Sequence, residues 1–165
     1  MRPPTPSQTV GPFFEFCLTP DATHRTVFPD SPSRLGLRIR VLDGGGNPVP
    51  DAVVEIWQGG NVPGGDAGFG RLGTHEDGCC VFDTVRPCAP PEGAAHINIC
   101  LFARGLLRHL HTRLYFAGDP CLAIDPVLTL VPESRRGTLI AEPDGGSYTF
   151  DIRLRGPQET VFFDV

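Results

Sequence analysis

Long hydrophobic runs and a surplus of positive charge are both missing from this sequence. No apolar stretch approaches the roughly 20 residues that a membrane-spanning helix needs. The formal net charge of -5 leaves no basic excess to hold a polyphosphate backbone. The first six residues have no apolar region behind their single arginine, so they do not resemble a secretion signal. We therefore expect a soluble cytoplasmic protein that binds neither nucleic acid nor membranes.

The cysteines lack the CxxC spacing of a paired-thiol or metal site. A chain without an export signal keeps its thiols reduced, so we expect no disulfide framework. We interpret these residues as small, buried or half-buried hydrophobic side chains. The six cysteines are Cys17, Cys79, Cys80, Cys88, Cys100 and Cys121.

Glycine and proline are abundant instead. The 165 residues include 20 glycines and 18 prolines, which break helices and mark turns. They lie between short apolar runs, a distribution typical of many strands joined by turns in a sandwich or barrel. The length fits a single domain, with an extended N-terminal arm over residues 1–33 and a β-sandwich core over residues 34–165.

Period-two alternation predicts two long strands, over residues 95–103 and 110–116, that pair with each other. On the first of them, the side chains opposite the apolar face include His96, Asn98 and Cys100. Shorter strands are expected at residues 37–41, 54–57, 81–85, 138–141, 148–154 and 160–163, with a hairpin turn at 144–146. The result is an all-β, mainly antiparallel sandwich. Its predicted core comprises Leu37, Ile39, Val41, Ile56, Ile97, Ile99 and Leu101.

Residues 40–58 resemble the core hairpin of the intradiol ring-cleavage dioxygenases. Prealbumin-like sandwich modules that only bind or only support share this pattern, so a non-enzymatic binding module is the alternative. Four further segments, 5–13, 95–105, 109–116 and 160–164, resemble the alpha subunits of this family in matching order. Together they extend the resemblance over almost the whole chain.

The resemblance implies a prealbumin-like sandwich that acts as one subunit of an enzyme. In this family, Fe(III) held by two tyrosinates and two histidines chelates the substrate and prepares its ring for attack by O2. The implied substrates are protocatechuate and O2, and the implied product is 3-carboxy-cis,cis-muconate. An alpha chain pairs with a homologous beta chain in a hetero-oligomer, and the beta chain holds the iron.

This sequence departs from the family's iron ligands. The two histidines of the family stand as H-x-H on a strand, and the matching residues here are His96 and Asn98. Tyr115 and Tyr148 are the only tyrosines, and both lie outside the family's tyrosinate segments, which match residues 58–70 and 86–95. We expect no metal in this chain, with His96 either a remnant or an ordinary buried, hydrogen-bonded histidine.

A second H-x-H pattern, His109-Leu110-His111, could begin a metal site. We find no third ligand for it, because His24 and His75 lie in turn-rich segments without supporting carboxylates. The preferred interpretation is a polar strand face used for an interface or for solvent.

Four residues match the positions at which the family's alpha chains line the substrate entrance of the partner's site: Thr9, Gly11, Pro12 and Arg104. A guanidinium suits the carboxylate of a hydroxylated benzoate. A straight strand would separate Arg104 from His96 by about 26 Å, so one small ligand cannot touch both. The alternatives are a simple turn at residues 9–12 and a solvated surface arginine.

Overall fold

The computed structural model describes residues 5–6, 8–11, 13–19, 25–26, 34–59 and 68–165. In this part of the chain, nine strands follow the order β1-β5-β2-β9-β8-β7-β6-β3-β4. The strands are β1 (Arg25–Thr26), β2 (Arg34–Leu42), β3 (Val53–Gln58), β4 (Gly68–Gly73), β5 (Cys79–Val85), β6 (His96–Phe102), β7 (Leu110–Phe116), β8 (Ile140–Asp144) and β9 (Ser147–Arg153). The helices are short: α1 (Phe13–Leu18), η1 (Leu122–Ile124), η2 (Leu128–Leu130), α2 (Glu133–Arg136) and η3 (Gly137–Leu139).

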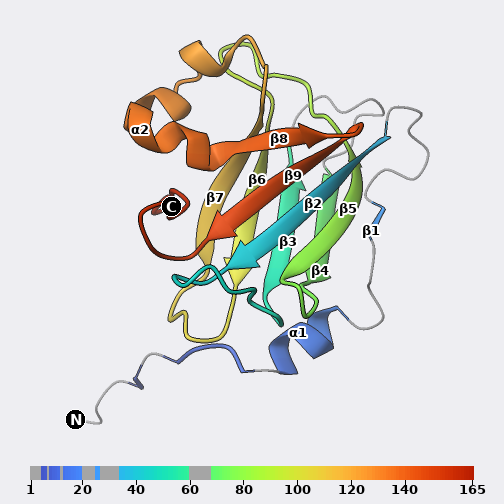
Figure 1. Ribbon diagram of the computed structural model, residues 1–165, viewed down its shortest axis with the longest axis vertical. Helices are drawn as coiled ribbons and strands as arrows, with labels where there is room; N and C mark the ends of the chain where they lie inside the picture. The colour runs from blue at the N-terminus through green and yellow to red at the C-terminus, as the bar shows by residue number, and fades with distance from the viewer. Residues whose placement is uncertain (1–4, 7, 12, 20–24, 27–33, 60–67) are drawn as a thin grey trace.

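The strands form two layers that face each other across one apolar core (Figure 1). One layer contains β5, β2 and β9, and the other contains β7, β6, β3 and β4. Strand β8 joins the layers, because it pairs parallel to β7 and antiparallel to β9. Antiparallel pairings outnumber parallel ones, so the expected all-β, mainly antiparallel sandwich is confirmed.

The predicted core is confirmed, since each of its seven residues is at most 1% exposed. Strand β2 illustrates the cause, because its side chains alternate between the two faces. Leu37, Ile39 and Val41 point inward, whereas Arg40 lies on the outer face and pairs with Asp151 at 2.7 Å. Burial of apolar surface in this way is the main favourable term in folding.

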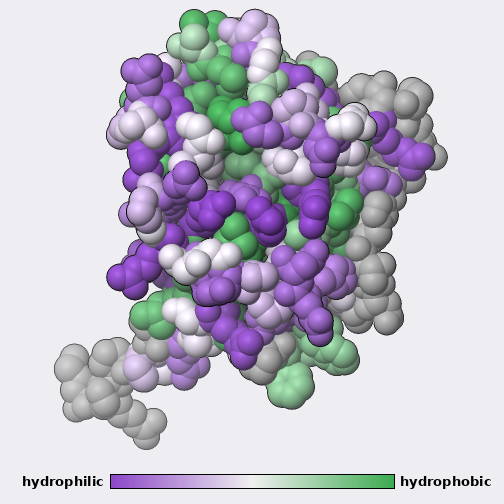
Figure 2. All heavy atoms as spheres, in the orientation of Figure 1, coloured by the Kyte–Doolittle hydropathy of each residue, from purple (hydrophilic) through white to green (hydrophobic). Residues whose placement is uncertain are grey.

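The outer face of β2, β8 and β9 is polar. Figure 2 shows hydrophilic side chains gathered across the middle of this face. A groove of about 540 Å³ opens there, and its lining includes Arg38, Arg40, Arg135, Asp151 and Arg153. In the described part of the chain, no helix is long and apolar enough to cross a membrane.

The expected hairpin at residues 144–146 joins β8 to β9. Gly145 and Gly146 have φ angles of 55° and 93°. A two-residue hairpin turn of this kind needs positive φ at both central positions, which glycine adopts without steric cost. The two glycines therefore fix the register in which Asp144 faces Ser147.

Three expected strands differ from the structure. The strand expected at residues 138–141 begins only at Ile140, because residues 137–139 form the helical turn η3. Residues 160–163 form a single bridge, between Phe163 and His111, instead of a strand. Side-chain hydrogen bonds hold this segment, because the Thr112 hydroxyl donates to the Val161 carbonyl at 2.7 Å. Strand β6 ends at Phe102, and Arg104 lies in the following turn, where Gly105 has a φ of 88°.

Several elements were not predicted, including the short strand β1. Strand β4 reads Gly-Phe-Gly-Arg-Leu-Gly, and its glycines conceal the alternation that marks a strand. The helical turns between residues 122 and 139 cover a second apolar cluster around Tyr115 and Leu139. Residues 13–18 form helix α1 where an extended arm was expected, although much of residues 1–33 lies outside the described part.

Leu37→Ala should lower the free energy of unfolding by about 2 to 5 kcal/mol, because it opens a cavity in the fully buried core. Leu130→Ala is the matched control, since that side chain is 82% exposed and should change stability by less than about 0.5 kcal/mol. Urea denaturation of the full chain measures both changes. Equal losses in the two variants would contradict this description of the core.

Candidate functional site

The outer face of the β4-β3-β6-β7 layer carries the polar side chains that the sequence singled out. Strand pairing arranges them in rows, because directly opposed residues point to the same side of a sheet. The row across β3, β6 and β7 that contains Asn98 also contains Trp57 and Arg113. Helix α1 lies at one end of this layer and residues 119–139 lie at the other (Figure 1).

His96 lies at the end of the layer covered by residues 119–139. Its side chain is partly buried, and its Nδ1 is 3.0 Å from the Ala94 carbonyl oxygen. Its ring contacts that of Tyr115, with ring centroids 5.6 Å apart. Burial lowers the pKa of His96, and the nearby Arg113 guanidinium lowers it further. A neutral, hydrogen-bonded imidazole therefore occupies this position.

Tyr115 and Asp125 form a buried pair beside His96. The Tyr115 hydroxyl donates to Asp125 Oδ1 at 2.9 Å, and burial raises the pKa of Tyr115 to about 12. Asp125 also accepts hydrogen bonds from the Ala94, Val127 and Leu128 amides. Burial acts to raise the pKa of Asp125, but these hydrogen bonds outweigh it and lower that pKa. The pair fastens the loop at residues 125–128 to β7.

A shallow cavity of about 410 Å³ opens beside His96, with Arg113 and Asp125 in its lining. These residues do not fit a ferric ion. Asn98 offers an amide where the family has an imidazole, and the Tyr115 hydroxyl is protonated and bonded to Asp125. The Arg113 cation lines the same cavity as His96, so it would repel a metal ion there.

Two of the expected entrance residues, Thr9 and Arg104, lie near the opposite end of β6. Thr9 Oγ1 accepts a hydrogen bond of 2.7 Å from the Gly105 amide, which joins the N-terminal segment to the turn after β6. Arg104, in that turn, pairs through Nε with Asp51 Oδ2 at 2.5 Å and remains 56% exposed. Gly11 is exposed and accepts from the Phe14 amide at 3.1 Å. Pro12 lies outside the described residues.

The distance expected between Arg104 and His96 assumed that the strand continues through Arg104. Because β6 ends at Phe102, the straight-strand distance does not apply. The two residues still lie beyond opposite ends of the strand, and Arg104 turns toward Asp51, in the loop before β3. They therefore belong to different parts of this face.

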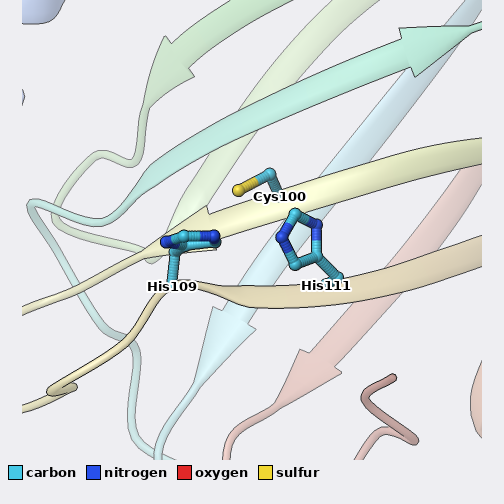
Figure 3. Close-up of side chains that lie close together, drawn as sticks. All are labelled: Cys100, His109 and His111. Carbon is cyan, nitrogen blue, oxygen red and sulfur yellow. The ribbon is translucent and has the colours of Figure 1, made fainter. Parts of the chain in front are cut away.

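The second H-x-H pattern does have a third potential ligand, contrary to our sequence-based interpretation. Cys100 on β6 faces His111 on β7, and His109 stands just before β7. Figure 3 shows the three side chains turned toward one another. One ligand atom from each lies within 4.8 Å of the others. Neither of the histidines considered earlier is involved, and His24 lies outside the described residues.

The three residues of this cluster differ in exposure. Cys100 is buried, and burial raises the pKa of its thiol to about 11. His111 is partly buried, and burial lowers its pKa, with a further lowering from His109. His109 is exposed and packs against the ring of Phe102, at a centroid distance of 5.4 Å. The sequence held two indications of this cluster. Cys100 alternates onto the outer face of its strand, and that strand was expected to pair with the one that carries His111.

Solved structures with a similar fold include several dioxygenases. The dioxygenase domain of a carbohydrate-binding fusion protein from Streptomyces sp. SirexAA-E is 26% identical, with a TM-score of 0.60, and the match covers 93% of this chain and 99% of that one. Catechol 1,2-dioxygenase from Pseudomonas arvilla C-1 matches in fold, with a TM-score of 0.62 at 22% identity, over 82% of this chain and 57% of that chain. The fold is thus that of the intradiol dioxygenase class.

Curated relatives narrow this class. The protocatechuate 3,4-dioxygenase alpha chain of Burkholderia cepacia is 40% identical, over 98% of this chain and 97% of the relative. The alpha chain of Pseudomonas putida is 41% identical, over 99% and 98%. The beta chain of Burkholderia cepacia is 36% identical, over 87% and 74%. This chain belongs to the family of protocatechuate 3,4-dioxygenase alpha chains. No family model matches it.

These relatives give no support to the alternative of a non-enzymatic binding module. Both alpha chains match over nearly their full length, and the names of all three relatives describe dioxygenase chains. The chain is therefore a subunit of a dioxygenase.

Asp125→Asn should lower the free energy of unfolding by about 1 to 3 kcal/mol at pH 7, because it removes the charge that accepts several buried hydrogen bonds. The folded-state pKa lies below the unfolded value of about 3.9, so this stabilisation is complete above that pH. It is lost as the pH falls through the folded value, and the difference from wild type should shrink below about pH 4.

Urea denaturation of wild type and Asp125→Asn between pH 7 and pH 3 measures this dependence. Asp164→Asn, at an exposed position, is the control and should change little at any pH. A difference that stays constant over this range would contradict the role assigned to the Asp125 carboxylate.

Proposed function

We propose that this chain is the non-iron-binding alpha subunit of a protocatechuate 3,4-dioxygenase, with a homologous beta chain as its partner. The substrates are protocatechuate and O2, and intradiol cleavage gives 3-carboxy-cis,cis-muconate. The main support for this proposal is the match to two curated alpha chains over nearly the full length of each. The similarity to a curated beta chain supports a homologous partner.

The iron belongs to the partner chain in this proposal. Support comes from the His96 end of the outer face, where Asn98 and the neighbouring Arg113 cation make a poor ferric site. When bound in the partner, iron supplies the chemistry that joins O2 to the ring. The residues of this chain bind and orient the substrate beside that centre.

Thr9, Gly11, Pro12 and Arg104 form this chain's part of the substrate entrance. The hydrogen bond from the Gly105 amide to Thr9 supports the assignment, because it brings two distant segments to one place. The ion pair with Asp51 orients Arg104. A guanidinium has five N–H donors, so one ion pair does not exhaust its capacity to bind the carboxylate of protocatechuate.

Two further assignments belong to the proposal. Residues 34–165 form one sandwich domain with residues 1–33 as its arm, which the single apolar core between the layers supports. The enzyme works in the cytoplasm, which is supported by all six cysteines being free thiols.

The isolated chain should carry no stoichiometric iron and should lack the red-brown absorption of tyrosinate bound to ferric ion. The physical reason is that one imidazole and both tyrosinates of the family's ligand set are missing. Elemental analysis and a visible spectrum of the purified chain measure this. Tightly bound iron near one equivalent, with that colour, would overturn the proposal.

Arg104→Ala, in the assembled enzyme, should raise KM for protocatechuate more than it lowers kcat. A charge-assisted contact is worth about 1.5 to 3 kcal/mol, and the exposed position weakens it, so kcat/KM should fall about tenfold to a hundredfold. Steady-state oxygen uptake gives both constants.

Two controls separate recognition from assembly. Catechol lacks the carboxylate, so the variant should process it nearly as wild type does. Arg108→Ala removes another exposed arginine from the same loop and should leave KM for protocatechuate unchanged. If Arg104→Ala impairs catechol as much as protocatechuate, the arginine supports the subunit interface and its recognition role is wrong.

A further inference from the structure

We propose that Cys100, His109 and His111 bind a divalent transition-metal ion of the zinc type. Their ligand atoms already lie within 4.8 Å of one another. Tetrahedral zinc needs these atoms slightly closer, since its Zn–S and Zn–N bonds are about 2.3 and 2.0 to 2.1 Å long. His109 is exposed, so its ring can rotate to close the difference.

The ligand set selects the kind of metal. One thiolate and two imidazoles suit zinc and other borderline-soft ions, whereas Mg²⁺ and Ca²⁺ prefer oxygen ligands. Three protein ligands leave the fourth tetrahedral position to water. In the described residues, this is the one group of three or more His, Cys, Asp or Glu side chains whose ligand atoms converge in this way.

The strands around the cluster position its ligands. Glu55 on β3 stands in the same row as Cys100 and His111, and it is held by Arg71 at 2.6 Å. A carboxylate behind the ligands offsets part of the charge of a cation and can orient an imidazole or a bound water. The paired strands fix the backbone at Cys100 and His111, so two of the three ligands are placed before a metal arrives.

A metal here would act on the loop that carries Arg104. Cys100 lies before the loop at residues 103–109, and His109 and His111 lie at or after its end. An ion bound to all three residues would clip the two ends of this loop together. The structure therefore assigns the site a structural role, in which binding stabilises the turn that presents Arg104.

Cobalt titration of the metal-stripped full chain tests the site directly. Wild type should bind one equivalent of Co²⁺ and develop the charge-transfer absorption of a cobalt–thiolate bond, which Zn²⁺ should then displace. Cys100→Ser should abolish the absorption, and His111→Asn should weaken binding about tenfold or more. Cys121→Ser, which removes a partly buried thiol outside the cluster, should behave as wild type.

Two further measurements keep the test decisive if a variant folds poorly or if the chain is stable only with its partner. Zn²⁺ should raise the Tm of wild type and not that of Cys100→Ser. In the complex co-purified with the beta chain, wild type should contain about one more zinc per alpha chain than Cys100→Ser does. Equal zinc contents, or a cobalt absorption that survives Cys100→Ser, would overturn the proposal.

Discussion

The register of β6 against β7 decides which side chains meet on the outer face of the sandwich. Ile97 faces Leu114 inward, while Asn98 faces Arg113 outward, and each row follows from one antiparallel ladder. A slip of one residue in either strand would exchange its apolar and polar faces. The buried side of the ladder therefore holds the register, and the outer face inherits its geometry from the apolar core.

The same ladder separates three local environments. At one end, His96 is hydrogen-bonded to the Ala94 carbonyl, beside the pair that Tyr115 forms with Asp125. In the middle, Cys100 and His111 face each other. Beyond the other end, Thr9 and Gly105 hold the N-terminal segment against the turn of Arg104. The proposed substrate entrance and the His96 environment therefore lie at opposite ends of this ladder.

Much of the fold was predictable from alternation and turn chemistry. The alternation of Leu37, Ile39 and Val41 identified a strand and its buried face, and Gly145 with Gly146 identified a hairpin. Strand β4 was hidden because its glycines have no side chains to alternate. The helical turns between residues 122 and 139 were missed because their order depends on contacts with other segments, such as that of Asp125 with Tyr115.

The candidate site was only partly predictable, because its residues are brought together by tertiary structure. The alternation of side chains predicted that Cys100 lies on the outer face, but the residue opposite it depends on the register of β6 against β7. The proposed entrance residues were inferred from the family resemblance alone, because no local pattern predicts that Thr9 contacts Gly105, 96 residues away. Local sequence determines which face a side chain occupies, and tertiary structure determines its neighbours.

Co-expression of this chain with a candidate beta chain, followed by an assay of protocatechuate-dependent oxygen uptake, tests the proposed subunit role most directly. The two chains should co-purify, and activity should require both of them, with all of the iron retained by the beta chain. Uptake at the full rate by the beta chain alone, or an active preparation of this chain without any partner, would contradict the proposal.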